Sequence, residues 1–365
     1  MSAHGPMPAS SWIYPVLAIL FFAVAAALGL SYQGGAAGLA FAAVLLVILF
    51  GTVFAAVHHA EVIAERIGEP FGTLLLTLSV TVIEVALIET LMLGDNPNPA
   101  LARDTVFAVV MIVCNGLVGV CMLAGGLRFR EQEFRVSGAS LYLCVLVVLA
   151  TITLVLPNYT KTTPGPLYSE AQLAFVSVVT VILYGVFLYT QTVRHRDYFI
   201  AGHSNDGGGA APAPNRLLLL SIVLLPASLL AVVLLAKKFS TVVEAGAALI
   251  GAPPAFAGLV VALLILLPES VAAIAAARAN DLQKSINLAL GSSLATIGLT
   301  VPAVAVVTVA LHKPLVLGLG SQETVLLALT VLVSMLTFGT GRTNVLFGLV
   351  HTLVFAVYVF LVFAP

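Results

Sequence analysis

Residues 78–89 read LSVTVIEVALIE, and this otherwise apolar stretch carries two acidic side chains, Glu84 and Glu89. A charged side chain at the centre of a bilayer costs at least about 2.5 kcal/mol. Acids at such a depth face a protein interior or a water-filled cavity, where they often mark ion or proton pathways. If this segment spans a membrane, its acids are therefore the first candidates for a functional site.

The whole chain has the composition of an integral membrane protein. It has 365 residues, of which 61% are hydrophobic and 8% charged, and its mean hydropathy is +1.13. Soluble domains have about a quarter of their residues charged. Because a helix needs about 20 apolar residues to cross the hydrocarbon, the sequence predicts an all-α polytopic membrane protein with about eleven spans. They are expected at residues 13–31, 36–57, 70–93, 104–127, 139–157, 171–193, 217–236, 254–277, 285–311, 323–340 and 343–363.

One hydrophilic stretch, residues 195–216, divides these spans into two sets. Its Gly, Ala, Pro and Asn are typical of a linker. We expect a leading transmembrane helix at 1–35, a five-helix repeat at 36–194, this linker on the cytoplasmic side, and a second five-helix repeat at 217–365. Because five is odd, the second repeat would be inverted relative to the first. Inverted repeats are a common plan of transporters, with the binding site near the midplane.

The distribution of Lys and Arg predicts the orientation. With the N-terminus in the cytoplasm, ten of the 15 basic residues fall in inner loops and five in outer loops, as the positive-inside rule requires. We therefore expect a bacterial inner-membrane protein with a cytoplasmic N-terminus and an external C-terminus. The segment before the first apolar run has no Lys or Arg, so that run is expected to be retained rather than cleaved. The net charge of −1 and the lack of a basic patch give no indication of a nucleic-acid partner. The lipid bilayer is the expected surrounding.

Three acids lie at hydrocarbon depth, where no Lys or Arg occurs. Glu84 is in the third span and Glu269 in the eighth, which are corresponding members of the two sets of five. Glu89 has no such counterpart and lies near a span end, where it can reach water. The structural alternative for the first two is a salt bridge with Arg103 or Arg278 reaching inward from a helix end.

The functional interpretation is that Glu84 and Glu269 face one cavity and share a cation. Ca²⁺ takes six to eight oxygen ligands, and two carboxylates neutralise its two charges. When the cation leaves, nearby desolvated carboxylates take up protons instead. Cation and protons then compete for one site, which predicts exchange of one for the other.

Further oxygen atoms lie near the two acids in the sequence. Thr77 and Thr81 lie on the helix face of Glu84, and Pro268 frees a carbonyl of its helix unless it marks an ordinary kink. Hydroxyls bonded to their own helices are the alternative for the others. The expected supporting residues are Thr77, Thr81, Asn115, Pro268, Ser292, Ser293 and Thr296.

These residues also carry a family resemblance. Residues 266–302, LLPESVAAIAAARANDLQKSINLALGSSLATIGLTVP, resemble calcium/proton antiporters of the ChaA type in the calcium/cation exchanger superfamily. Glu269 and the Gly-Ser-Ser at 291–293 fall at the family's positions. Residues 68–89 and 341–348 resemble the family as well, with Glu84 at the acidic position of the first half.

The resemblance implies one leading helix plus two inverted five-helix repeats. It implies that Glu84 and Glu269 bind Ca²⁺ and protons in turn, with Ca²⁺ as transported substrate and no cofactor. Some relatives carry Na⁺ or K⁺ against protons, so these cations are also candidate substrates. The departures bear on selectivity: Val80-Thr81 and Ile265-Leu266 stand where plant and fungal relatives have Gly-Asn, and Val110-Met111 replaces a Gly-Ser.

Three other functions remain as alternatives. A Na⁺- or K⁺-coupled exchanger, or a monovalent cation/proton antiporter, would keep the site and change the ions. A cation channel would normally use a symmetric filter ring, which an internally duplicated chain does not suggest. An enzyme is not expected: residues 57–66, VHHAEVIAER, do not match the His-Glu-x-x-His zinc pattern, and a solvated helix end is the default interpretation of His58 and His59.

Overall fold

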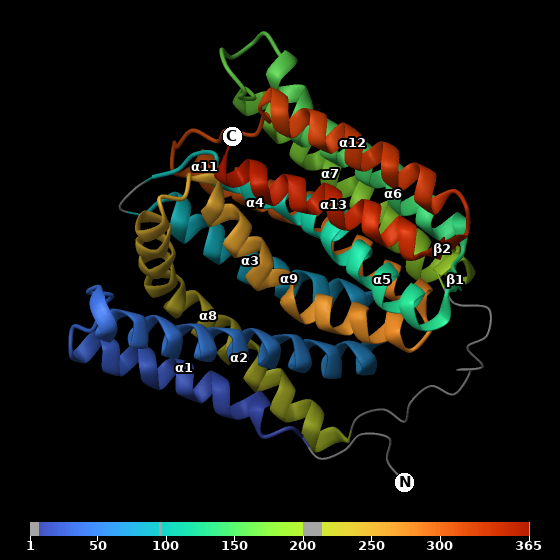
Figure 1. Ribbon diagram of the computed structural model, residues 1–365. Helices are drawn as coiled ribbons and strands as arrows, with labels where there is room; N and C mark the ends of the chain where they lie inside the picture. Colours follow the sequence, from blue (N-terminus) through green and yellow to red (C-terminus); the bar gives the residue numbers. More distant parts are fainter. Residues whose placement is uncertain (1–6, 95–96, 200–213, 365) are drawn as a thin grey trace. The chain divides into compact units, whose positions relative to one another are not determined.

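The computed structural model describes residues 7–94, 97–199 and 214–364. Within them, eleven helical segments are long and apolar enough to cross a membrane, which confirms the all-α polytopic fold class (Figure 1). Seven of these segments are single helices: α1 Ser10–Ala27, α2 Gly35–Ile67, α3 Phe71–Met92, α8 Asn215–Ile250, α9 Ala255–Arg278, α12 Ser321–Phe338 and α13 Val345–Phe363.

The other four segments are built from more than one element. The fourth comprises α4 Leu101–Met111, η1 Ile112–Leu117 and α5 Val118–Phe129, and the ninth α10 Leu282–Ala295, η6 Thr296–Thr300 and α11 Val301–Ala310. The fifth comprises α6 Val136–Ala150, η2 Thr151–Val155 and η3 Leu156–Tyr159, and the sixth α7 Glu170–Tyr189 and η4 Thr190–Arg194. Outside the spans lie η5 Arg196–Phe199, β1 Glu131–Glu133 and β2 Arg342–Asn344. Most of the predicted linker, 200–213, lies outside the described residues.

Two helices extend well beyond their predicted ends. α2 continues to Ile67 and α8 to Ile250, where the apolar runs predicted ends at 57 and 236. Hydropathy stops at the charged and polar residues that follow, but the local sequence is rich in good helix formers such as Ala and Glu. Both helices therefore continue beyond the ends of their apolar runs.

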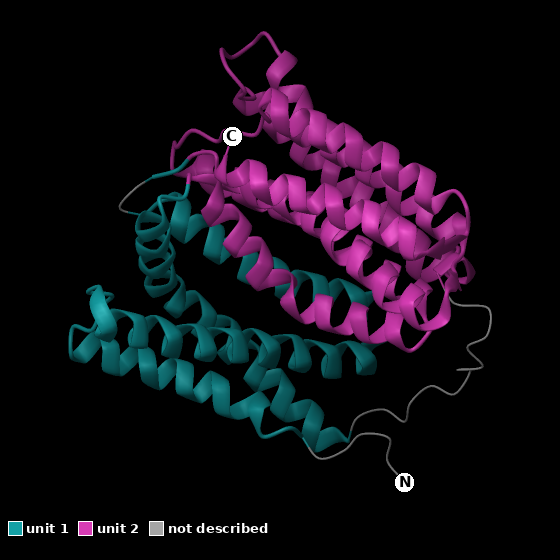
Figure 2. Ribbon diagram, viewed as in Figure 1, with its two compact units in different colours: residues 1–98, 205–252 teal, residues 99–204, 253–365 magenta. Residues whose placement is uncertain are grey.

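The chain divides into two compact units (Figure 2). Unit 1 comprises residues 1–98 and 205–252, and unit 2 comprises residues 99–204 and 253–365. Each unit takes helices from both predicted repeats, because the repeats follow chain order and the units follow contacts. Three pairs of corresponding segments are close in length: 33 and 36 residues in α2 and α8, 22 and 24 in α3 and α9, and 29 in both the fourth and the ninth span. The fifth and sixth spans, of 24 and 25 residues, are longer than the tenth and eleventh, of 18 and 19. The first three pairs fit the pattern that a duplication would produce.

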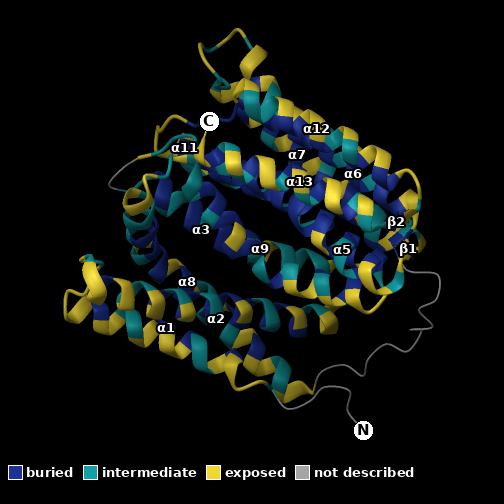
Figure 3. Ribbon diagram, viewed as in Figure 1, coloured by how far each residue is buried: buried dark blue, intermediate teal, exposed yellow. Residues whose placement is uncertain are grey.

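Unit 1 is formed around α2. This helix packs against α8, α1 and α3, and α3 also packs against α8. The ring of Tyr14 in α1 lies on Gly51 of α2, where an added Cβ would come within 2.2 Å of Tyr14 Cδ1. Large apolar side chains are exposed along both helices, Leu20 at 56% and Val47 at 59% (Figure 3). Such a surface is suited to lipid tails, which are as apolar as Leu.

Unit 2 is formed around the fourth span and α9. The helix α9 packs against α4, α5 and α10, while α13 packs on α5 and η1, and α7 on α11 and η6. The fourth span is the most enclosed, with 89% of its most apolar window buried. The carboxylate of Glu269 therefore lies on a helix that contacts both the fourth and the ninth span.

The loops of unit 2 gather at two opposite ends. At one end β1 pairs antiparallel with β2, and Gln132 Nε2 donates to Ala277 O at 2.9 Å. At the other, Val316 N donates to Pro99 O at 3.0 Å and Gly318 N to Pro166 O at 3.1 Å. Loops that alternate along the chain thus share an end, as expected if consecutive spans cross in opposite directions.

Gly258 sets the approach of α9 to α4, and replacing it should destabilise the protein. A Cβ there would lie 2.8 Å from Asp104 C and from Thr105 N, which are backbone atoms that cannot rotate away. Overpacking of this kind costs about 1–3 kcal/mol, so we expect Gly258→Ala to lower the thermal unfolding midpoint in detergent. Gly246→Ala is the matched control, because nothing lies within 4 Å of its added Cβ. Equal midpoints for the two variants would contradict the close contact.

Candidate cation-binding site

Glu84 lies in the second half of α3 in unit 1, and its side chain is 1% exposed. It follows the first residue of the helix by thirteen positions. The atom Oε1 is shielded from solvent. An acid this deeply enclosed within an apolar span is stable when hydrogen bonds, a basic partner, a proton or a bound cation offset the cost of its charge.

Glu269 occupies the equivalent place on α9 in unit 2, fourteen residues after the helix begins. Its side chain is partly exposed, with Oε2 shielded from solvent. The preceding Pro268 is buried inside the helix, where it has no N–H to donate to the carbonyl four residues earlier. The two acids thus share their depth along corresponding helices but differ in exposure.

Three of the five predicted hydroxyl groups donate to carbonyls of their own helices. Thr77 Oγ1 donates to Thr73 O and Thr81 Oγ1 to Thr77 O, both at 2.9 Å, and Ser293 Oγ donates to Leu290 O at 2.8 Å. Ser292 is partly exposed on α10. A hydroxyl oxygen that donates its hydrogen keeps lone pairs that can accept or coordinate, so these residues remain predicted ligands.

Each 29-residue span contains a π-helical turn near its middle, a feature that was not predicted from the sequence. These turns are η1, which contains Asn115, and η6, which begins at Thr296. At the end of η1 the N–H of Val118 bonds to Val113 O, five residues back. Single π turns inside α-helices occur frequently at functional sites. Hydropathy carries no signal for them, because a π turn is as apolar as the α-helix around it, and in a span that is apolar on all sides the shift of the helix face by one residue cannot be seen in the spacing.

Arg103 does not fill the role of a structural partner for the buried glutamates. Its Nη2 lies 2.7 Å from Asp104 Oδ1, and its Nη1 donates to Gly318 O at 3.2 Å. Arg278 is exposed at the end of α9. The salt bridge that forms in this part of unit 2 is therefore between neighbours in the first turn of α4.

Glu89 and His59 lie in environments that the sequence did not predict. Both carboxylate oxygens of Glu89 are shielded from solvent and make no hydrogen bond to any residue that the structure describes, although a near-interface position had suggested contact with water. The solvated helix end expected at 57–66 is wrong for His59, which is 0% exposed. Its Nε2 bonds to Ser11 O at 2.9 Å and its Nδ1 to Ser221 Oγ at 3.0 Å, because α2 continues as a packed helix beyond the predicted end.

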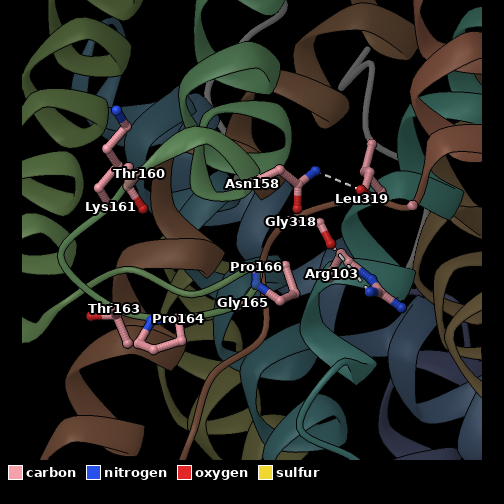
Figure 4. Close-up of a pocket in the computed structure, with 11 residues that line it drawn as sticks. Arg103, Asn158, Thr160, Lys161, Thr163, Pro164, Gly165, Pro166, Gly318 and Leu319 are labelled. Carbon is pink, nitrogen blue, oxygen red and sulfur yellow. Dashed lines mark hydrogen bonds between the residues drawn. The ribbon is translucent and has the colours of Figure 1, made fainter.

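A cavity of about 730 Å³ lies at the end of unit 2 where the first turn of α4, the segment between η3 and α7, and the loop before α12 meet (Figure 4). Arg103, Asn158 and Lys161 line it, and Asn158 Nδ2 donates to Leu319 O at 2.6 Å. None of the predicted site residues lines this cavity. Across the described residues, no group of three or more His, Cys, Asp or Glu side chains is placed to hold a metal ion.

The chain's similarity to known proteins identifies its family. The family described as sodium/calcium exchanger protein matches residues 37–193 and 220–364. The chain belongs to this family of membrane transporters, which are cation exchangers and not enzymes.

Two relatives resemble the chain over almost its full length. The putative ionic transporter y4hA of Sinorhizobium fredii is 46% identical over 100% of this chain and 98% of its own. The sodium-potassium/proton antiporter ChaA of Escherichia coli is 37% identical over 97% of this chain and 96% of its own. This similarity confirms the antiporter resemblance found in the sequence.

Solved structures share the fold. Native YfkE superposes with a TM-score of 0.73, at 17% identity over 97% of this chain and 100% of that one. The H⁺/Ca²⁺ exchanger CAX gives a TM-score of 0.68, at 16% identity over 96% and 87%. The two segments matched by the family, 37–193 and 220–364, begin and end within a few residues of the predicted repeats, whose inversion stays a prediction.

Proposed function

We propose that the protein is a secondary antiporter that exchanges Ca²⁺, or Na⁺ and K⁺, against protons. The observation that carries this proposal is the matched pair of acids, Glu84 and Glu269, at the same depth of corresponding helices in a cation exchanger. Each carboxylate is either protonated or bound to the cation. The predicted hydroxyl and carbonyl oxygens of their helices complete the coordination.

Because the cation and the protons occupy the carboxylates in turn, the transport of one is coupled to the transport of the other. A buried carboxylate that is neither protonated nor cation-bound is strongly disfavoured at this depth. If such an empty, charged site does not change its accessible side, each cation that crosses in one direction requires protons to cross in the other. Exchange then follows without any further energy source.

Two observations bear on which cation is transported: the names of the relatives, and the residues near the acids that differ from those of plant and fungal relatives. ChaA is named for sodium, potassium and protons and CAX for protons and Ca²⁺, so both substrate classes are tested. Where plant and fungal relatives have Gly-Asn before each acid, this chain has Val80-Thr81 and Ile265-Leu266. The site therefore has fewer neutral side-chain oxygens for a divalent ion. Two carboxylates nevertheless match the charge of Ca²⁺.

The decisive test is the collapse of a proton gradient in everted membrane vesicles. We expect a pH-sensitive dye to report collapse when Ca²⁺, Na⁺ or K⁺ is added to vesicles that contain the protein, and no collapse with vesicles that lack it. Collapse by Ca²⁺ at low concentration identifies a calcium/proton antiporter, whereas collapse by Na⁺ or K⁺ alone identifies a monovalent antiporter. No collapse with any of the three would refute proton coupling.

The proposed orientation places the N-terminus in the cytoplasm and the C-terminus outside. It is supported by the clustering of basic residues at the loop end of unit 2 that holds β1 and β2, including Arg128, Arg135 and Lys284. A C-terminal alkaline phosphatase fusion should be active, because that enzyme requires an oxidising exterior for its disulfides. An active green fluorescent protein fusion at the same terminus would reverse the assignment.

A further inference from the structure

A chain of buried polar side chains joins the π turn η1 to the last two helices of unit 2. It consists of Asn115 on η1, Thr330 and Thr337 on α12, and His351 on α13, all between 0% and 1% exposed. His351 Nδ1 lies 3.3 Å from Asn115 Oδ1, and its Nε2 lies 3.0 Å from Thr337 Oγ1. Asn115 Nδ2 donates to Thr330 Oγ1 at 2.9 Å. We call these four residues the His351 network.

The hydrogen bonds of the network run in one direction. Thr330 Oγ1 donates to the sulfur of Met111 at 3.4 Å, so it accepts from the Asn115 amide nitrogen. This assigns the amide oxygen of Asn115 to face His351, and an amide oxygen only accepts. His351 therefore carries a hydrogen on Nδ1, and in the neutral ring its Nε2 accepts from the hydroxyl of Thr337.

The network holds a part of the backbone that departs from α-helical geometry. Besides Asn115, the imidazole of His351 also interacts with the backbone of Cys114, which lies in the same π turn. A π turn shifts the backbone hydrogen bonds by one residue, so its shape depends on neighbours. The turn also contacts α9, the helix of Glu269.

From these contacts we propose that His351 is a positioning residue of the antiporter, which holds η1 and Asn115 in the arrangement competent to bind the cation. The inference rests on the proposed function and concerns the same site. In this arrangement both amide atoms of Asn115 are bonded to α12 and α13. Asn115 thus links the π turn to these helices, and His351 determines the apparent cation affinity through it.

Loss of the hydrogen bond between His351 and Asn115 should raise the KM for the cation more than it lowers Vmax. Removing one partner of a buried hydrogen bond leaves the other partner unsatisfied and away from water, which disfavours the arrangement that contains it. If that cost falls on the binding-competent arrangement, the apparent affinity falls with the fraction of protein that adopts it. A residue that only supports folding would lower the amount of active protein, and therefore Vmax, and leave KM unchanged.

Two replacements of His351 test the roles of its two ring nitrogens separately. An Asn side chain reaches the position of Nδ1 and can donate to Asn115, whereas a Gln side chain reaches the position of Nε2 and serves Thr337 only. With the cation that collapses the gradient in vesicles, we expect His351→Asn to keep KM within about threefold of wild type and His351→Gln to raise it about tenfold. His312→Asn is the control, because His312 is exposed in a loop and its KM should equal that of wild type.

Two further measurements complete the test. Asn115→Ala should raise KM as His351→Gln does, and the double variant should be no worse than either, because residues that act as a unit are not additive. The pH profile of His351→Asn should match that of wild type, since Asn does not titrate and His351 is not proposed to carry a transported proton. Thr330→Val, which removes the acceptor of the Asn115 amide, should raise KM as well if His351→Gln accumulates poorly.

The proposal fails if His351→Gln and Thr330→Val keep wild-type KM, if His351→Asn is as impaired as His351→Gln, or if His351→Asn changes the pH profile. Glu269→Gln, measured in parallel, tests the proposed function separately. Retained exchange in Glu269→Gln would refute the paired-acid site. The KM values of the His351 variants would in that case still show whether the network positions η1 for cation exchange.

Discussion

Glu84→Gln and Glu269→Gln should each abolish exchange while leaving a folded, membrane-inserted protein. Gln has nearly the shape of Glu but carries neither the charge that balances a cation nor a group that takes up a proton. Removing one charged partner of a buried interaction costs about 3–5 kcal/mol, which corresponds to a loss of about 100-fold or more. The measurement is cation-induced collapse of the proton gradient in everted vesicles, normalised to the amount of protein.

The chain provides a matched control in the same helix. Glu89→Gln makes the same substitution five residues after Glu84 in α3, at an acid with no counterpart in the second half. We expect Glu89→Gln to retain exchange, with the effect confined to stability. Retained exchange in Glu84→Gln or Glu269→Gln would remove that residue from the site, and loss in Glu89→Gln would add a third acid to it.

The sequence predicted the membrane fold well, because its signal is strong and local. The backbone N–H and C=O groups of each span must form hydrogen bonds within the span, and its side chains must lie in the protein interior or in lipid. Apolar runs therefore mark the helices directly. The predicted ends failed at α2 and α8, where polar side chains continue a helix that is packed inside unit 1. His59 shows the reason, since its bonds to Ser11 and Ser221 come from other helices.

The candidate site could be predicted only in part. Glu84 and Glu269 stand out because each charge is costly in an apolar span. His351 lies in an apolar run near the C-terminus and gave no such signal, because a neutral imidazole can be satisfied by two hydrogen bonds that only the folded protein provides. The π turns gave none, because Asn115 and Thr296 fit an α-helical face as well as a π-helical one.

The π turns also suggest how the two predicted repeats cooperate within unit 2. η1 belongs to the first repeat and packs against α13 of the second, while η6 belongs to the second and packs against α7 of the first. Gly298 of η6 lies against Tyr184, where a Cβ would come 2.7 Å from Tyr184 Cβ. The last span of each predicted repeat therefore contacts the π turn of the other, by hydrogen bonds at His351 in one case and by close packing at Tyr184 in the other.

The apparent affinity for the cation should fall steeply as the pH falls. In the proposed function protons and cation compete for the same carboxylates, so protonation removes the form that binds the cation. In the pH range where the free site is protonated, each displaced proton raises KM about tenfold for each unit decrease in pH. A Ca²⁺ ion that displaces two protons should therefore raise KM about 100-fold per unit, and an ion that displaces one proton about tenfold.

Calorimetric titration of the purified protein measures the same quantity without transport. Binding of the cation should release protons, and their number follows from the heats recorded in two buffers with different ionisation enthalpies. Near two protons per Ca²⁺ would support both carboxylates acting on one ion, and Glu84→Gln and Glu269→Gln should each reduce the number. A KM that stays constant between pH 6 and 8, with no proton release, would contradict competition at the site. The exchange would then be driven by a second cation, and Na⁺-dependent uptake in vesicles would measure it.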